Sequence, residues 1–67
     1  SASNLVGADL YMAYLSSTDL SSANLSGADL RGANLSGSIL NDTILNGALL
    51  QGAQLNGALL IEAKIQQ

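Results

Sequence analysis

Several residue types on which catalysis and covalent cross-linking depend are missing from this chain. Its 67 residues include no cysteine and no histidine, which excludes disulfide bonds, thiolate nucleophiles and imidazole-based acid–base or metal chemistry. Proline, phenylalanine and tryptophan are also absent, and the only aromatic residues are Tyr11 and Tyr14. A mixed, jigsaw-like core is therefore not expected.

Charged residues and long apolar runs are also scarce. Five acidic and two basic residues give a net charge of -3, which disfavours direct contact with nucleic acid or with an anionic membrane. The longest apolar runs, such as residues 58–61, fall far short of the roughly 20 residues that span a bilayer. Residues 1–3 lack the basic and apolar segments of a signal peptide. We therefore expect no membrane-spanning segment.

What the chain does have is a five-residue repeat whose register never slips. Every fifth residue, from Leu5 to Ile65, is Leu or Ile. A small residue lies two positions before each of them, and all 7 glycines lie two positions after one of these leucines. The predicted core consists of the repeated apolar position: Leu5, Leu10, Leu15, Leu20, Leu25, Leu30, Leu35, Leu40, Leu45, Leu50, Leu55, Leu60 and Ile65.

A period of five fits neither standard element. On an α-helix, five steps of about 100° would scatter the leucines around the cylinder. On a strand, an odd step would place successive leucines on opposite faces. A chain that turns a corner once per repeat and coils around an axis keeps every fifth residue inside. The small residue and the Leu then both point inward, and glycine lies at the corner.

The most regular stretch resembles a known family. Ala23-Asn24-Leu25-Ser26-Gly27 is followed by two further units of the same form, residues 28–32 and 33–37, and such runs are similar to those of the pentapeptide repeat family. The resemblance implies an all-β fold, a right-handed quadrilateral β-helix with four repeats in each coil. Residues 1–67 would form a single solenoid of about three coils. The family's abundance in cyanobacteria and in the chloroplast implies the cytoplasm or the thylakoid lumen as the compartment.

The ends of such a short solenoid need an explanation. Solenoids need capping to prevent end-to-end association, yet the last residues, 62–67, still follow the repeat. Three interpretations stay open: a fragment of a longer chain, an oligomer, or a solenoid capped by a partner.

The outward position before each Leu changes character halfway along the chain. It is polar or aromatic up to Asn34 and mostly aliphatic from Ile39 onward. Contiguous exposed apolar area usually marks an interface, although aliphatic residues also simply suit an extended outer segment. We predict an interface for a protein partner or for self-association in the C-terminal half, made of Ile39, Ile44, Leu49, Leu59 and Ile61.

The acidic residues of the first half allow other interpretations. Residues 20 apart should stack, which places Asp9 beside Asp29, with Asp19 on another face. This column is a solvated polar face, a carboxylate ladder that imitates DNA phosphates, or a poor Ca²⁺ site with too few ligands. The same stacking places Arg31 near Tyr11 in a structural cation–π contact. Asn24 and Asn34 are expected to satisfy backbone groups in turns or to form polar ladders.

These observations favour a non-enzymatic structural or protein-binding module. The carboxylates do not converge, and a solenoid packed with leucine should have no cavity. We therefore expect no catalytic residues, no cofactor, no metal and no small-molecule substrate. The alternative, which the resemblance suggests, is an acidic DNA mimic that binds a type II topoisomerase through Asp9, Asp19 and Asp29.

Overall fold

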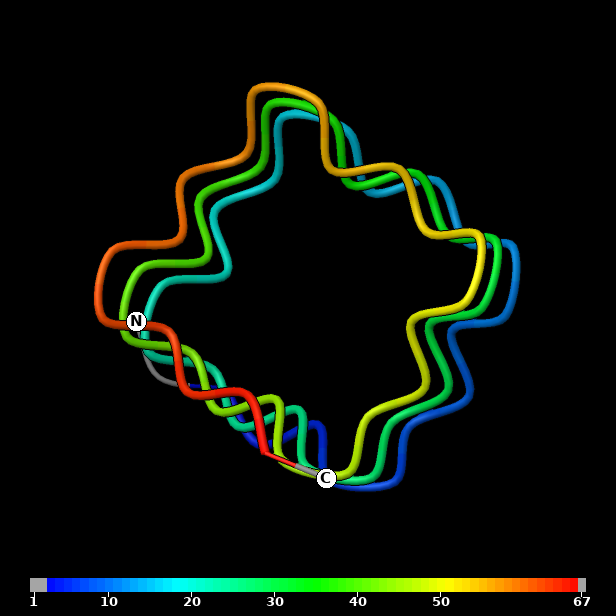
Figure 1. Cartoon of the computed structure of the whole chain (residues 1–67), viewed down its shortest axis with the longest axis vertical. Helices are drawn as coiled ribbons and strands as arrows, with labels where there is room; N and C mark the ends of the chain where they lie inside the picture. Colours follow the sequence, from blue (N-terminus) through cyan, green and yellow to red (C-terminus); the bar gives the residue numbers. More distant parts are fainter. Residues whose placement is uncertain (1–2, 67) are drawn as a thin grey trace.

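The chain winds as a square coil whose turns stack along one axis (Figure 1). The computed structural model describes residues 3–66. Within them the β structure consists of single bridged residues, with no helix and no longer strand. Each bridged residue pairs in parallel with the residue 20 positions later, from Asn4 with Asn24 to Ile44 with Lys64. The predicted coil of four repeats is confirmed.

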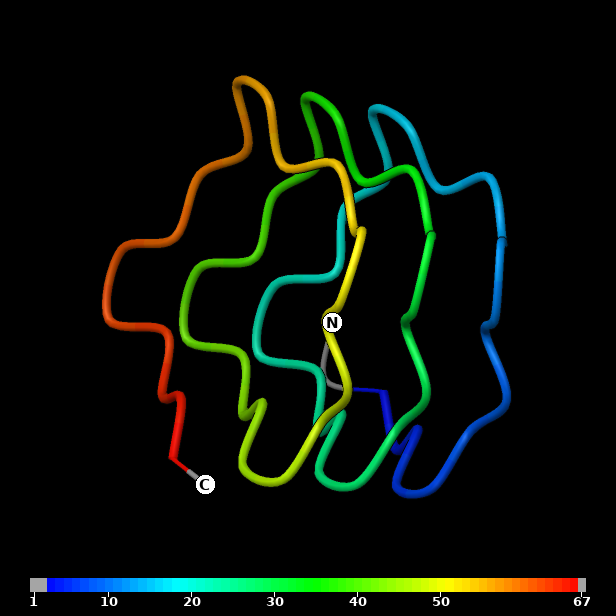
Figure 2. The same ribbon diagram turned by 45° about the vertical axis from the view of Figure 1, so that its right-hand side comes forward.

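Four faces follow from these bridges, and we number them in chain order. Each face is a column of outward residues in successive coils. Face 1 holds Asn4, Asn24, Ile44 and Lys64; face 2 holds Asp9, Asp29 and Leu49; face 3 holds Tyr14, Asn34 and Gln54; face 4 holds Asp19, Ile39 and Leu59. Coil 1 is residues 3–22, coil 2 is 23–42 and coil 3 is 43–62, and residues 63–66 begin a fourth. Figure 2 shows the coils side by side.

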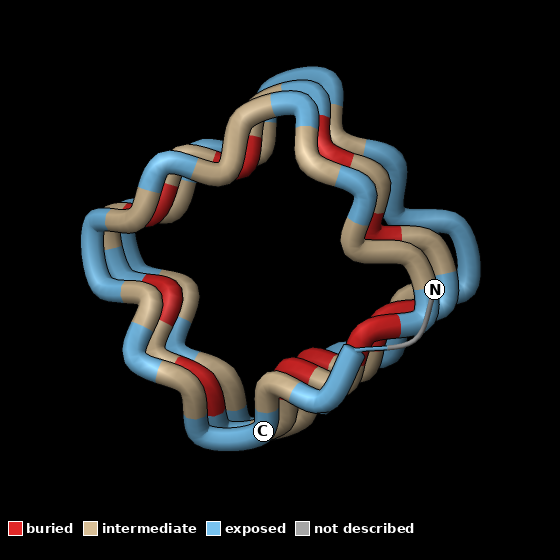
Figure 3. Tube along the Cα trace, turned by 180° about the vertical axis from the view of Figure 1, so that it is seen from behind, coloured by how far each residue is buried: buried red, intermediate tan, exposed pale blue. Residues whose placement is uncertain are grey.

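The core runs along the middle of the coil and is most complete in coil 2. The inward small residues and leucines from Ala23 to Leu45 are almost fully buried, whereas those nearer either end are only partly covered (Figure 3). Two of the buried inward positions carry hydroxyls, and both are satisfied: Ser38 Oγ donates to the Leu35 carbonyl at 2.7 Å and Thr43 Oγ1 to the Leu40 carbonyl at 2.8 Å. The buried residues are Ala23, Leu25, Ala28, Leu30, Ala33, Leu35, Ser38, Leu40, Thr43 and Leu45.

Each corner is a four-residue β-turn that begins at the Leu, and its third residue lies two positions after that Leu. The Ala8 N–H donates to the Leu5 carbonyl at 3.0 Å, and the same bond recurs along the chain. The third turn residue has a left-handed backbone, as at Gly7 with φ of 69°, while the second does not. One positive φ at this position defines a type II turn, which favours glycine there. The predicted placement of glycine at the corners is confirmed.

Backbone hydrogen bonds join the coils in a fixed direction. The N–H of each repeat Leu up to Leu45 donates to a carbonyl in the following coil, as Leu25 does to Ile44 at 2.7 Å. The N–H of the bridged residue donates back to the preceding coil, as Ile44 does to Ala23 at 2.9 Å. This directional pattern leaves the two end coils with different unpaired groups.

The molecule is as long as it is wide. Its Cα atoms extend over 19 × 19 × 18 Å, because only about three coils are stacked. No helix within residues 3–66 is long and apolar enough to cross a membrane.

Candidate interaction surface

Three of the five predicted interface residues lie together at one edge of face 4. Ile39 is bridged to Leu59 in the next coil, and Ile61 lies at the corner that follows Leu59. Leu59 is 48% exposed and Ile61 65% exposed, whereas Ile39 is half-buried between neighbouring coils. We call Ile39, Leu59 and Ile61 the side patch.

The other two predicted residues lie on different faces. Ile44 is half-buried on face 1 between Asn24 and Lys64. Leu49 lies on face 2 beyond Asp29 and is 41% exposed. The aliphatic outer positions of the C-terminal half therefore extend over three successive faces, and only the side patch combines stacking on one face with high exposure.

An unusual backbone contact supports the side patch. At the Asn and Asp positions on the faces of coils 1 and 2, as at Asp19 and Asn24, the side chain accepts the N–H two residues later, but Leu59 has no oxygen for this purpose. Instead, the Ile61 N–H donates to Asn41 Oδ1 in the coil before it, at 3.1 Å. The exposed corner that presents Ile61 thus keeps its hydrogen bond although the face residue is aliphatic.

The predicted acidic column exists on face 2, but it is not a free carboxylate ladder. Asp9 is bridged to Asp29 as expected. Arg31, however, forms a bidentate pair with Asp29, through Nε to Oδ1 at 2.9 Å and through Nη2 to Oδ2 at 2.7 Å. The column then ends in Leu49. Asp19 lies on face 4, so the three carboxylates do not converge.

Arg31 connects this column to coil 1. Its guanidinium lies 5.2 Å from the centre of the Tyr11 ring, which confirms the predicted cation–π contact. Hydrogen bonding from Arg31 lowers the pKa of the Asp29 carboxyl and raises the pKa of the guanidinium. Hydrogen bonds from the hydroxyl and N–H of Ser21 lower the pKa of Asp19.

The amide and carboxylate side chains of coils 1 and 2 serve the turns. Asn24 Oδ1 accepts the Ser26 N–H at 3.1 Å, and Asn34 Oδ1 accepts the Ser36 N–H at 3.1 Å. This confirms the expected turn role of the two asparagines. The sequence reasoning missed that the aspartates do the same: Asp9 accepts from Tyr11, and Asp29 from Arg31. In every case the acceptor side chain and the donor N–H are two residues apart, and this spacing could have been read from the sequence.

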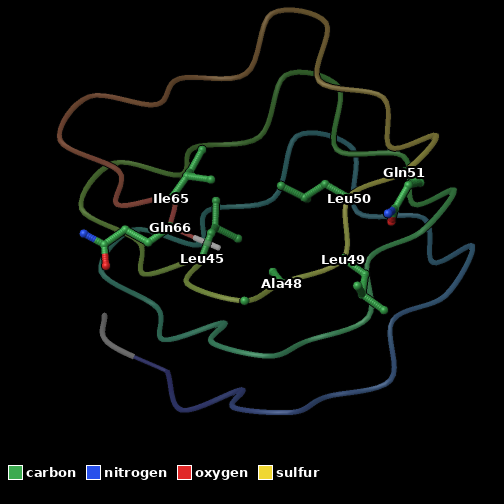
Figure 4. Close-up of a pocket in the computed structure, with 8 residues that line it drawn as sticks. Leu45, Ala48, Leu49, Leu50, Gln51, Ile65 and Gln66 are labelled. Atoms are coloured by element: carbon green, nitrogen blue, oxygen red, sulfur yellow. The ribbon is translucent and has the colours of Figure 1, made fainter.

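The expectation that the solenoid has no cavity is wrong at its C-terminal end. A hollow of about 630 Å³ opens there, with Leu45, Ala48, Leu50 and Ile65 around it (Figure 4). The physical reason is that no further coil covers the inner leucines of residues 43–66. The hollow is therefore the uncovered end of the core, and within residues 3–66 no cluster of acidic side chains could hold a metal ion.

A second apolar surface, on coil 1, was also missed. Val6, Tyr11, Met12 and Tyr14 are all well exposed, with Tyr14 the most exposed at 78%. The five-residue repeat places these residues at outward positions, so their exposure could have been predicted from the sequence. The predicted interface was confined to the C-terminal half because the apolar change after Ile39 is more continuous.

Comparison with known proteins identifies the fold family. The family model described as pentapeptide repeats matches residues 1–32 and 28–67, in 8 copies. The chain belongs to the pentapeptide repeat family. It is a right-handed quadrilateral β-helix, as the relatives of known structure are.

Solved pentapeptide repeat proteins from cyanobacteria are similar to this chain. Rfr23 from Cyanothece 51142 is 37% identical with a TM-score of 0.89, over 91% of this chain and 42% of that protein. HetL from Nostoc sp. strain PCC 7120, which is involved in heterocyst differentiation regulation, is 30% identical with a TM-score of 0.50, with the same coverages of 91% and 42%. The chain thus spans less than half the length of either protein. No curated protein sequence matches it.

Proposed function

We propose that this pentapeptide repeat chain is a non-enzymatic module that binds another protein through the side patch. The observation that carries the proposal is the bridged pair Ile39 and Leu59 with Ile61 at the adjoining corner, where Leu59 and Ile61 are 48% and 65% exposed. An aliphatic surface held on a rigid backbone favours binding, because little conformational entropy is lost on contact.

The partner expected for this surface is a protein with an apolar patch of its own. The side patch contains no charged residue, so electrostatic steering would contribute little. The area of three side chains is small, which is typical of weak, reversible contacts rather than obligate ones.

The proposal is tested by comparative capture. The chain and two variants are immobilised, and the proteins retained from an extract of the source organism are quantified. The patch variant combines Ile39→Asn, Leu59→Asn and Ile61→Asn, and the control combines Val6→Asn and Met12→Asn, which remove exposed apolar groups elsewhere. We expect at least one protein to bind the chain and the control and to be lost from the patch variant. No protein with this pattern would contradict the proposal.

The alternative partner, a type II topoisomerase bound through Asp9, Asp19 and Asp29, has less support. Asp29 is neutralised by Arg31, and Asp19 lies on another face from the column. A DNA supercoiling assay with added protein separates the two functions, since a DNA mimic would inhibit or protect the enzyme. A side-patch binder would leave supercoiling unchanged.

A further inference from the structure

Two columns of outward side chains flank the corner between faces 2 and 3. The corner position that follows face 2 carries Tyr11, Arg31 and Gln51 in successive coils, and face 3 carries Tyr14, Asn34 and Gln54. We call these residues the lateral grid. It lies on the side of the solenoid, where added coils at either end would lengthen both columns and leave their outer side free.

Coil 1 contributes two exposed aromatic rings to the lateral grid. Tyr11 is 59% exposed and Tyr14 is 78% exposed, on either side of the corner. A tyrosine side chain presents an apolar ring face together with a hydroxyl that both donates and accepts hydrogen bonds. A sugar has the same two characters, with C–H groups on the faces of its ring and hydroxyls around the rim. The two rings are therefore suited to contact with a carbohydrate.

The amide side chains of the lateral grid retain hydrogen-bonding groups for a ligand. Asn34 accepts the Ser36 N–H through Oδ1 at 3.1 Å, which leaves its NH2 group available. The side chains of Gln51 and Gln54 are exposed and form no hydrogen bond within residues 3–66. A side-chain amide both donates and accepts hydrogen bonds. Sugar hydroxyls do the same, so the amides match them without any requirement for charge.

The charge of the lateral grid favours a neutral ligand. Arg31 is its one charged residue, and the guanidinium is paired with Asp29, Nη2 to Oδ2 at 2.7 Å. The Tyr11 ring, whose centre lies 5.2 Å from the guanidinium, holds the same side chain from the coil before it. A side chain that is ordered before the ligand arrives lowers the entropic cost of binding. The net charge of the chain, -3, disfavours an anionic ligand.

Glycine leaves the backbone open between the two columns of the lateral grid. The turn positions there are Gly32 in coil 2 and Gly52 in coil 3. A Cβ at Gly32 would collide with the Met12 sulfur, so this side chain already covers Gly32. At Gly52 a Cβ would only touch the Gly32 backbone, at 3.7 Å. A close approach of a ligand to the backbone is one use of glycine, and Gly52 permits it beside the amides of coil 3.

We propose that the lateral grid binds a neutral, extended oligosaccharide along face 3. One sugar ring packs on Tyr14, and the hydroxyls of the following rings exchange hydrogen bonds with Asn34 and Gln54. Successive coils lie about 4.8 Å apart, which is close to the length of one sugar unit in an extended β-1,4-linked chain. The lateral grid is an open surface and not a pocket, so binding is weak, with a dissociation constant of about 1 mM.

Nuclear magnetic resonance measures this weak binding directly. The ¹⁵N-labelled chain is titrated separately with the neutral β-1,4-linked tetrasaccharides of glucose, mannose and xylose, each up to about 10 mM. With at least one of them, the backbone amide signals of Tyr14, Asn34 and Gln54 should shift and approach saturation. No shift with any of the three sugars, or shifts confined to other faces, would overturn the proposal.

Substitutions test which side chains hold the sugar. Tyr14→Ala removes the ring and should weaken binding at least about tenfold, a loss of about 1.4 kcal/mol. Gln54→Leu keeps the size of the side chain but removes its amide, and should weaken binding severalfold. Val6→Ala is the control, since Val6 is 57% exposed in coil 1 but lies at another corner. All three positions are exposed, so the fold should persist, and circular dichroism checks it. Unchanged affinity in Tyr14→Ala would overturn the proposal.

A charged sugar tests the preference for a neutral ligand. The β-1,4-linked tetramer of glucuronic acid has the same linkage as the glucose tetramer but carries a carboxylate on each ring. It should bind at least about tenfold more weakly than the best neutral sugar, and equal binding would overturn the neutral preference.

The lateral grid and the side patch are separate surfaces, so the two proposals fail independently. The side patch lies on face 4 and at the corner after it, whereas the sugar would lie along face 3. The combined variant Ile39→Asn, Leu59→Asn, Ile61→Asn should lose its protein partner and bind the sugar as the unmodified chain does. Loss of sugar binding in this variant, with its fold intact, would overturn the placement on face 3.

Discussion

At the residue scale, the turn positions differ in how well the residue suits its backbone. The third turn residue has a left-handed backbone in every repeat within residues 3–66, but glycine fills it in only some of them. The other positions carry Met12, Ser17, Ser22, Asp42 and Glu62, with φ near 60°. A side chain at such a φ crowds the following carbonyl, so these turns are less favourable than those with glycine.

Replacement of Ser22 by glycine should therefore stabilise the protein. Relief of left-handed strain outweighs the greater freedom of glycine in the unfolded chain, and we expect a gain of about 0.5–1 kcal/mol in the free energy of unfolding. Urea denaturation followed by circular dichroism measures the change. Gln51→Gly is the matched control, because Gln51 is a turn residue without positive φ. An equal gain at both positions would contradict the strain argument.

The lowered pKa values of Asp19 and Asp29 predict loss of stability in acid. Both carboxyls bind a proton more weakly in the folded chain than in the unfolded chain, so protonation favours unfolding. Their contribution is present above the unfolded pKa, about 3.9, and is lost as the pH falls through the lower folded values. The melting temperature should fall between about pH 4 and pH 2. The double variant Asp19→Asn, Asp29→Asn should flatten this part of the profile; an unchanged slope would assign the loss to other groups.

At the scale of the single repeat, the face residue and the turn act together. Asn24 Oδ1 accepts both the N–H of Ser26, at 3.1 Å, and its hydroxyl, at 2.7 Å. Asn24→Ala should cost about 0.5–1.5 kcal/mol, the usual net value of such hydrogen bonds. Gln54→Ala is the control on face 3, where no hydrogen bond from this side chain to the turn occurs. Calorimetric unfolding compares the two, and a cost at Gln54 as large as at Asn24 would contradict this assignment.

The repeat explains why so much of each coil followed from sequence. Once every fifth residue must point inward, the stacking of Asp9 with Asp29 and of Ile39 with Leu59 follows from four repeats per coil. The period places a residue on a face, but its exposure depends on the neighbouring coils. Ile39 and Ile44 are covered on both sides by other coils, whereas Leu59 has a coil on one side only. The pattern could not predict this difference, nor the pairing of Arg31 with Asp29.

At the scale of the whole molecule, the burial of an inward residue depends on where its coil lies along the solenoid axis. Leu30 and Leu40 are buried in coil 2, while Leu60, which stacks on Leu40 in coil 3, is 38% exposed. The hollow at the C-terminal end has the same origin. Since contacts occur mainly between successive coils, a solenoid behaves nearly as a one-dimensional stack whose ends are the weakest part.

The same substitution in two coils should therefore have unequal effects. Leu30→Ala should cost about 2–5 kcal/mol, as for buried leucines that leave a cavity, and Leu60→Ala about half as much or less. Urea denaturation in dilute solution measures both. Equal costs in dilute solution would mean that the end coil is as well covered as the middle one.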